Sequence, residues 1–459
     1  MRIESIRAIP GLSGFFFDDQ RAIKAGATQR GFAYDGPPKT AGFDRVREAG
    51  ESLIVELELA DGSVVTGDCA AVQYSGAGGR DPLFRASEYR PVVEGVVADA
   101  LRGRDATLFR DNAETLEAIA PQRSGGDRLH TAVRYGVSQA LLNAAARARG
   151  CTPTDVLAAA YDTDPATAPV PVFGQSGDER RTNAEKMLIK GVPVLPHGLF
   201  NSVEKVGREG EALREYLAWL ADRADALGPA SYAPRFHVDV YGILGEIFGP
   251  PYDRSEVTEY FDSLREAAAP YPLQVEGPMD AGSREAQIAR MAELRDGLAS
   301  AGVAVDIVAD EWCNTFDDVR AFVDAGAADV VQIKTPDLGG IQRSAEAVLY
   351  CDGTDTRAYL GGTCNETVTS ARACAHVALA TDAAQVLAKP GMGFDEGFMV
   401  VTNEMRRTLA RSSGAAPGRP STDRPGSPER SSADHSSGQS PREDGDSREA
   451  RSAGGGDDD

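Results

Sequence analysis

Lysine is scarce in this chain of 459 residues, because only seven of its 48 basic residues are lysine and the others are arginine. Acidic residues number 70, so the formal net charge is −22. This charge excludes nucleic acid and anionic membrane surfaces as expected partners, since both would be repelled. An acidic surface with few lysines favours a halophilic protein, in which concentrated salt screens the surface charges. A GC-rich genome, which also favours arginine over lysine, is the alternative explanation.

Cysteine pairs and long apolar runs are lacking as well. The six cysteines are scattered along the chain without a CxxC motif. This pattern is typical of reduced thiols in the cytoplasm and argues against a disulfide framework. No uncharged run approaches the roughly 20 apolar residues of a membrane-spanning helix, and the N-terminus shows no apolar core of a signal peptide. We therefore expect a cytoplasmic protein that does not associate with membranes.

The first third of the chain has the pattern of an α+β domain. Residues 3–10 are expected to form a short strand, and residues 52–59 alternate as Leu-Ile-Val-Glu-Leu-Glu-Leu, which is typical of a half-exposed strand. Residues 135–149 are rich in alanine and leucine and precede Gly150, a common helix terminator. We expect residues 1–162 to form this domain.

Strands and helices alternate from residue 163 to residue 410. Amphipathic segments such as 211–226 and 283–299 separate the apolar ones. This alternation predicts a parallel sheet, and a (β/α)₈ barrel uses roughly 250 residues for its eight units. The pattern therefore predicts an α/β fold with a TIM barrel. The apolar strands are expected near residues 172, 193, 237, 274, 305, 331, 358 and 386.

The composition changes again in residues 411–459. This segment is rich in Ser, Gly, Pro, Arg and Asp and contains no aromatic and no branched aliphatic residue. Such a segment lacks the apolar side chains needed to form a core, so we expect a disordered tail.

Four apolar runs end in a charged residue, namely Asp239, Glu276, Asp310 and Lys334. They are separated by 37, 34 and 24 residues, and one barrel unit takes about 31 residues. Each residue alone has an ordinary interpretation, a helix cap or a salt bridge for a carboxylate and a core ion pair for the lysine. Together they are spaced like the ends of successive strands, where a barrel carries its active site. Three carboxylates suit a hard divalent cation such as Mg²⁺, and a neighbouring lysine suits metal-assisted proton abstraction.

Longer motifs surround these positions, and together they resemble the methylaspartate ammonia-lyase family of the enolase superfamily. The resemblance extends from the N-terminal domain to about residue 405, and the tail has no recognisable counterpart. The motifs include Leu-Pro-His-Gly at 195–198, Glu-Gly-Pro-Met-Asp at 276–280, Asp-Glu-Trp-Cys at 310–313, Gln-Ile-Lys-Thr-Pro-Asp-Leu-Gly-Gly at 332–340, Gly-Gly-Thr-Cys-Asn-Glu at 361–366 and Lys-Pro-Gly-Met-Gly at 389–393.

The resemblance implies an α+β capping domain followed by a modified TIM barrel, and it implies a role for each site residue. Mg²⁺ would be bound by Asp239, Glu276 and Asp310, with Lys334 as the base and His197 on the opposite face of the site. The other implied site residues are Gln175, Gln332, Thr363 and Cys364 as substrate contacts and Gln73 and Leu387 as pocket walls. A homodimer and a monovalent cation such as K⁺ are implied as well.

The implied reaction is the reversible elimination of ammonia from threo-(2S,3S)-3-methylaspartate, which gives mesaconate. Lys334 would remove the weakly acidic C3 proton while Mg²⁺ offsets the charge of the enolate. His197 would either hydrogen-bond the metal-bound carboxylate or act as base for the other C3 epimer. We expect the glycine-rich loop at 76–81 to close over the site as part of the cap, and Lys389 to be structural.

Two other functions remain open from the sequence. The first is another enolase-superfamily lyase, such as an acid-sugar dehydratase. A cycloisomerase is disfavoured because its base strand carries a Lys-x-Lys pair where this chain has Gln332-Ile333-Lys334. The second is a non-catalytic scaffold that works through the tail. This hypothesis predicts that replacing Lys334 leaves function intact.

Overall fold

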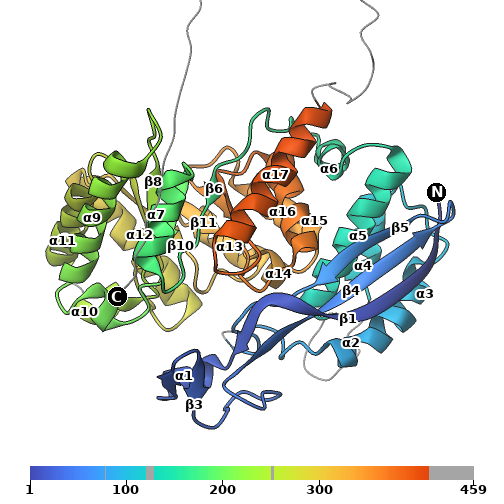
Figure 1. Ribbon diagram of the computed structural model, residues 1–459, viewed down its shortest axis with the longest axis horizontal. Helices are drawn as coiled ribbons and strands as arrows, with labels where there is room; N and C mark the ends of the chain where they lie inside the picture. The colour runs from blue at the N-terminus through green and yellow to red at the C-terminus, as the bar shows by residue number, and fades with distance from the viewer. Residues whose placement is uncertain (78, 120–128, 250–252, 413–459) are drawn as a thin grey trace, which may run out of the picture. The chain divides into compact units, whose positions relative to one another are not determined.

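The computed structural model of the chain describes residues 1–77, 79–119, 129–249 and 253–412 (Figure 1). Within the tail predicted for 411–459, residues 411 and 412 complete the last helix, α17 (Asp395–Ser412). The remainder of that prediction lies outside the described residues.

The N-terminal domain is built on an antiparallel sheet of three strands in the order β1-β4-β5. These strands are β1 (Ile3–Asp18), β4 (Arg47–Leu59) and β5 (Val64–Cys69). The predicted strands at 3–10 and 52–59 are confirmed, but both are longer in the structure. Proline and glycine inside β1 conceal its continuation, because these residues usually mark strand ends or bulges, and the pairing of β1 with β4 is indeed irregular between Leu12 and Phe16.

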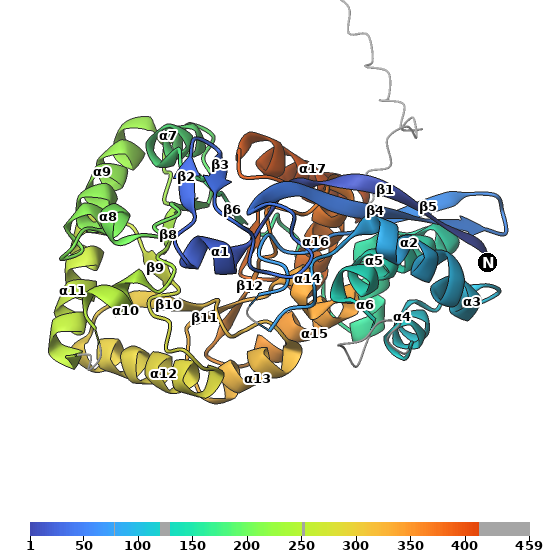
Figure 2. The same ribbon diagram turned by 90° about the horizontal axis from the view of Figure 1, so that it is seen from below.

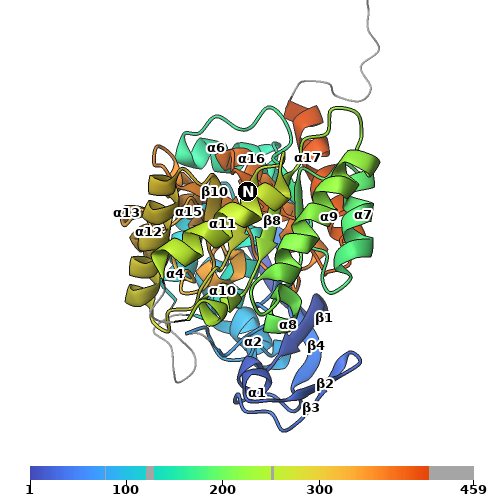
Figure 3. The same ribbon diagram turned by 90° about the vertical axis from the view of Figure 1, so that its left-hand side faces the viewer.

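Helices cover this sheet, and a small hairpin extends from it. Helix α5 packs so closely on β5 that a Cβ at Gly136 would lie 2.3 Å from the backbone nitrogen of Cys69. Figures 1 and 3 show α1 and β3 of the hairpin at the lower edge of the folded unit. The hairpin strands are β2 (Thr28–Arg30) and β3 (Ala33–Asp35). The helices are α1 (Gln20–Lys24), α2 (Ala86–Val92), a π-helix (Val93–Val97), α3 (Ala98–Leu101), α4 (Phe109–Glu117), α5 (Thr131–Arg149) and α6 (Pro153–Tyr161).

The second domain is a closed barrel of eight parallel strands. Every predicted strand is present, and each is followed by at least one helix, which confirms the (β/α)₈ prediction. The strands are β6 (Val172–Phe173), β7 (Val194–His197), β8 (Arg235–Asp239), β9 (Leu273–Glu276), β10 (Val305–Ala309), β11 (Val330–Gln332), β12 (Arg357–Leu360) and β13 (Gln385–Leu387).

The helices of the second domain form an outer layer around the strands (Figure 3). Short additional helices follow β7, β8 and β11 at the ends where the sequence places the chemistry. The helices are α7 (Arg180–Ile189), α8 (Val203–Val206), α9 (Glu211–Leu227), α10 (Ile243–Ile247), α11 (Arg254–Ala268), α12 (Arg284–Ala301), α13 (Phe316–Asp324), α14 (Thr335–Leu338), α15 (Ile341–Cys351), α16 (Val368–Thr381) and α17.

The two domains pack against each other through helices. Helix α5 contacts α14, α15 and α16, and α6 contacts α16. Figure 2 shows α5 and α6 beside α14, α15 and α16 in the view from below. The N-terminal domain therefore lies against the part of the barrel that carries β11 and β12. Among the described residues, none of the helices combines the length and apolar character needed to cross a membrane.

Candidate active site

The residues predicted from the sequence gather at the C-terminal ends of the barrel strands. His197, Asp239, Glu276, Gln332 and Leu387 are the last residues of their strands. The other predicted residues follow their barrel strands closely, except Gln73, which comes from the N-terminal domain. A cavity of about 90 Å³ opens among them. Ten of the eleven predicted residues line this cavity, namely Gln73, Gln175, His197, Asp239, Asp310, Gln332, Lys334, Thr363, Cys364 and Leu387.

The order of the strands divides the site into two arcs. His197 ends β7 and Lys334 follows β11, and three strands separate β7 from β11 in either direction around the barrel. Histidine and lysine therefore face each other across the barrel mouth. One arc between them consists of β8, β9 and β10 and carries the three carboxylates. The other arc consists of β6, β12 and β13 and carries the residues expected to hold the substrate.

A group of ligand atoms suited to a metal ion lies at the first arc. Single ligand atoms of His197, Asp239 and Glu276 all lie within 4.8 Å of one another, and His197 Nε2 is 3.3 Å from Asp239 Oδ2. Burial, followed by the negative charges of Asp239 and Asp310, raises the pKa of Glu276 well above its ordinary value. A divalent cation would offset this repulsion between buried carboxylates, so the residues present fit Mg²⁺.

The third predicted carboxylate has a different partner in the structure. Asp310 Oδ1 lies 2.6 Å from Lys334 Nζ, and both side chains are buried. Burial lowers the pKa of Lys334, but the charges of Asp310 and Glu311 outweigh this effect, so the pKa is raised. In the described state Lys334 is therefore the counter-ion of Asp310 and carries a proton.

Glu276 is held in place by hydrogen bonds, and two residues of this network, His237 and Gln385, were not among the predicted site residues. His237 Nε2 lies 2.8 Å from Glu276 Oε2, and Gln385 Nε2 lies 2.9 Å from the other ring nitrogen of His237. Gln332 donates a hydrogen bond from Nε2 to Glu276 Oε1. His237 could have been found, because it stands two residues before Asp239 on the same strand and therefore faces the same side.

The opposite arc presents polar groups without strong charge. Thr363 and Cys364 follow β12. Gln332 ends β11 at the border of this arc, and its Oε1 has no hydrogen-bond partner among the described residues. Burial raises the pKa of the Cys364 thiol to about 12. Cys364 is therefore a neutral thiol at physiological pH, which makes it a poor nucleophile.

The N-terminal domain contributes Gln73 to the same cavity. Gln73 donates from Nε2 to Asp18 Oδ2 at 2.6 Å, and its Oε1 accepts from Cys364 Sγ at 3.6 Å. Arg47 donates two hydrogen bonds of 2.7 Å to the carboxylate of Asp18. No local sequence pattern indicates this group, because Asp18 lies 55 residues from Gln73 and 29 residues from Arg47.

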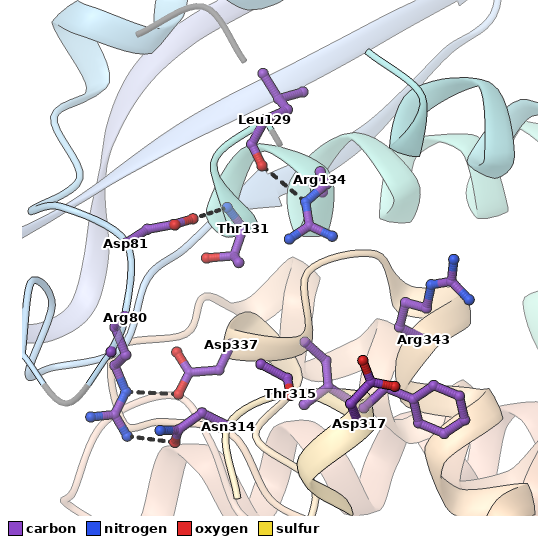
Figure 4. A pocket seen from close by; sticks show the side chains of 13 residues that line it. Arg80, Asp81, Leu129, Thr131, Arg134, Asn314, Thr315, Asp317, Asp337 and Arg343 are labelled. Carbon is purple, nitrogen blue, oxygen red and sulfur yellow. Dashed lines mark hydrogen bonds and ion pairs between the residues drawn. The ribbon is translucent and has the colours of Figure 1, made fainter. Parts of the chain in front are cut away.

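Arg80 connects the loop of the N-terminal domain to the barrel. It donates to Asp337 Oδ2 at 2.8 Å and to Asn314 Oδ1 at 3.0 Å, as Figure 4 shows. The side chains of Arg80 and Asp337 are each 7 % exposed. Arg80 lines both the active-site cavity and a neighbouring hollow of about 510 Å³. The predicted closing loop is thus attached to the barrel in the described structure.

Two family models together match nearly all of the residues that the structure describes. The family model described as "Methylaspartate ammonia-lyase N-terminus" matches residues 1–162, and the one described as "Methylaspartate ammonia-lyase C-terminus" matches residues 164–413. The chain is 85% identical over 411 residues to a methylaspartate ammonia-lyase from Haloarcula marismortui, which covers 90% of this chain and 97% of that protein.

Solved structures agree with the sequence comparison. A Mg-complex of beta-methylaspartase from Clostridium tetanomorphum is 50% identical, with a TM-score of 0.86, and covers 91% of this chain and 100% of that one. A methylaspartate ammonia lyase from Citrobacter amalonaticus, containing (2S,3S)-3-methylaspartic acid, is 50% identical with a TM-score of 0.87 and covers 90% and 100%. Sequence, fold and site together show that this chain belongs to the methylaspartate ammonia-lyase family.

Proposed function

We propose that the protein is a carbon–nitrogen lyase that eliminates ammonia from threo-(2S,3S)-3-methylaspartate and releases mesaconate, in a reversible reaction. The observation that carries this proposal is the barrel order, which sets Lys334 opposite His197 with carboxylates on one arc and neutral polar groups on the other. A substrate held between the two arcs would present its C3 proton either to Lys334 or to His197, but not to both. The relatives named above are methylaspartate ammonia-lyases.

Asp239, Glu276 and Asp310 would hold Mg²⁺, with His197 beside them. When bound, Mg²⁺ supplies positive charge next to the substrate carboxylate adjacent to C3, which stabilises the negative charge that develops as the proton leaves. His237 and Gln332 orient Glu276 for this task through their hydrogen bonds. A related structure is a Mg-complex.

Lys334 would act as the general base and must be neutral to do so. In the described structure its proton is retained because Asp310 pairs with it. If Asp310 were engaged as a metal ligand, it would no longer serve as the counter-ion of Lys334, and burial would then favour the neutral amine. Metal binding and activation of the base would thereby be coupled through Asp310.

The arc of β6, β12 and β13, called the neutral arc because its polar groups carry no charge, would bind the substrate together with Gln332 at the end of β11. Gln175, Gln332, Thr363 and Cys364 offer hydrogen-bonding groups without adding charge beside the metal, and Gln73 and Leu387 would form the remaining walls. His197 would either hydrogen-bond the substrate carboxylate near the metal or serve as base for the other C3 epimer. After proton removal at C3, the C2–N bond breaks and ammonia leaves.

We further propose a homodimer in the cytoplasm that is adapted to high salt and uses a monovalent cation such as K⁺ in addition to Mg²⁺. The six cysteines are unpaired, as a reducing compartment requires. We also propose that the boundary between cap and barrel lies between residues 162 and 163; the proposal is supported by the length of chain between the end of α6 and the start of β6.

The proposal is tested by incubating the protein with threo-3-methylaspartate and Mg²⁺ and following the ultraviolet absorbance of mesaconate. Lys334→Ala should lower kcat by at least about 10²–10⁴-fold, the usual contribution of a positioned base, while circular dichroism and thermal unfolding stay close to those of the wild type. A chelator should abolish turnover, and added Mg²⁺ should restore it.

Lys190→Ala provides the control, because Lys190 pairs with Asp395 at the surface and should leave turnover unchanged. Full turnover by Lys334→Ala would contradict the proposed base and favour the scaffold hypothesis. Absence of mesaconate, together with turnover of a sugar acid, would instead favour a dehydratase.

A further inference from the structure

A fully buried ion pair lies directly behind the neutral arc of the site. Lys389 and Glu366 are both 0% exposed, and Lys389 Nζ lies 2.7 Å from Glu366 Oε1. The ammonium also donates to the carbonyl of Gly361 at 2.6 Å and to Thr335 Oγ1 at 3.3 Å. Such a pair is costly to desolvate, so it needs hydrogen bonds to its remaining polar atoms, and here all three ammonium donors have acceptors.

The carboxylate of Glu366 gathers groups from both domains. Oε1 accepts from Thr335 Oγ1 at 2.9 Å and from the backbone N–H of Thr363 at 3.3 Å. Oε2 accepts from the hydroxyl of Tyr135 at 2.6 Å. Tyr135 belongs to α5 of the N-terminal domain and is completely buried. One buried carboxylate therefore links the cap to the residues that immediately follow Lys334 and Gly362.

The loop at 361–366 leaves little room beside this carboxylate. Gly362 has φ +124°, and a Cβ there would lie 2.1 Å from Glu366 Oε1 and 2.5 Å from Lys389 Nζ. The backbone of Gly14 in β1 also donates to the carbonyl of Glu366 at 3.1 Å. The loop is thus fixed by its own ion pair and by two elements of the cap.

We propose that Glu366, Lys389 and Tyr135 are positioning residues, which hold the loop carrying Thr363 and Cys364 in the conformation that binds the substrate. The proposal rests on the proposed function, because Thr363 and Cys364 are assigned to substrate binding there. It assigns a role to Lys389 beyond ordinary packing. Glu366, Lys389 and Tyr135 do not line the cavity, so any effect on the substrate would pass through the loop.

The sharpest test is Tyr135→Phe, which removes one hydroxyl and keeps the ring. A lost hydrogen bond to a charged group should raise KM for 3-methylaspartate about 10-fold, with kcat changed by less than about twofold, because a loop that only grips the substrate affects ground state and transition state alike. The Mg²⁺ dependence should stay unchanged. Amide hydrogen exchange at residues 361–366 should become faster.

Tyr161→Phe is the matched control. Tyr161 is also a cap tyrosine that donates to a barrel glutamate, Glu346, at 3.1 Å, but it lies on α6, away from the loop. Its loss should leave KM and the exchange of residues 361–366 unchanged. The double variant Lys389→Met with Glu366→Gln removes both charges together, so no lone charge stays buried, and it should raise KM at least as much as Tyr135→Phe.

An unchanged KM and unchanged exchange in Tyr135→Phe would overturn the positioning role, whether or not the double variant folds. A wild-type protein that does not turn over 3-methylaspartate would overturn the proposed function instead. Hydrogen exchange would still decide the role of the network in that case, because it requires no turnover.

Discussion

His237 lies behind the site rather than in it, yet it determines how Glu276 is presented. Gln385 can only donate through Nε2, so the ring nitrogen that it contacts is an acceptor, and the other nitrogen carries the proton toward Glu276. Burial, followed by the charges of His197 and Arg235, lowers the pKa of His237 well below its ordinary value, so the ring is neutral. One oxygen of Glu276 is thereby fixed by a neutral donor.

Replacing this donor should weaken metal binding specifically. His237→Phe keeps the stacking on Phe173, whose ring lies 4.1 Å away, but removes both ring nitrogens. Because partners of metal ligands typically contribute 10–100-fold to affinity, the Mg²⁺ concentration for half-maximal rate should rise by about that factor. Titrating Mg²⁺ in the mesaconate assay measures this effect.

The control for His237→Phe is His376→Gln on α16, where the histidine pairs with Glu404 and should not affect the Mg²⁺ dependence. Equal Mg²⁺ requirements in wild type and His237→Phe would show that Glu276 needs no support from this ring.

At the scale of the residue, the sequence predicted the groups that face the cavity but not the groups behind them. Asp239, Asp310 and Lys334 stand out because each ends an apolar run. The pairing of Tyr135 with Glu366 spans 231 residues and that of Gln73 with Asp18 spans 55. Such contacts leave no local pattern in one sequence, because they arise only when distant segments fold together.

At the scale of the element, strand prediction worked best inside the barrel. Buried parallel strands are continuous apolar runs, and each is followed by an amphipathic helix, so the signal repeats. In the cap, the hairpin of β2 and β3 was not predicted, since its residues are mostly exposed and lack alternation. The loop at 76–81 was predicted to close over the site, and Arg80 supplies the contact through which it would do so.

Arg80 offers a test of that closure. Arg80→Met keeps the aliphatic part of the side chain but removes the bonds to Asp337 and Asn314. The loop that leads to Gln73 would then open more often, so KM for 3-methylaspartate should rise about 10-fold. Steady-state kinetics and amide exchange at residues 72–77 would report the change.

Arg85→Met is the matched control, because Arg85 forms its ion pairs with Glu48 and Glu51, inside the cap. If both arginine variants changed KM equally, the attachment of the loop to the barrel would not be the cause.

At the scale of the whole molecule, charge is the dominant property. A net charge of −22 destabilises a compact chain through self-repulsion at low ionic strength. At about 1 M salt the screening length falls to about 3 Å, so the melting temperature should rise steadily from low to molar KCl. Differential scanning calorimetry measures this dependence.

Sucrose at matched osmolality separates charge screening from general exclusion effects, because it stabilises proteins without ions. A melting temperature that KCl does not raise would contradict the halophilic hypothesis and leave a GC-rich genome as the explanation for the shortage of lysine.

The pairing of β13 with β6 closes the barrel, and it joins residues 386 and 387 to residues 172 and 173. Every proposed metal ligand lies between these two strands in the sequence. A ribosome synthesises the chain from its N-terminus. The edge of β6 that pairs with β13 therefore stays unpaired until nearly the whole folded unit has been translated. Unpaired edges invite aggregation. The nascent enzyme should therefore be most vulnerable late in synthesis, and chains truncated before β13 should fail to assemble the site even though they contain every ligand.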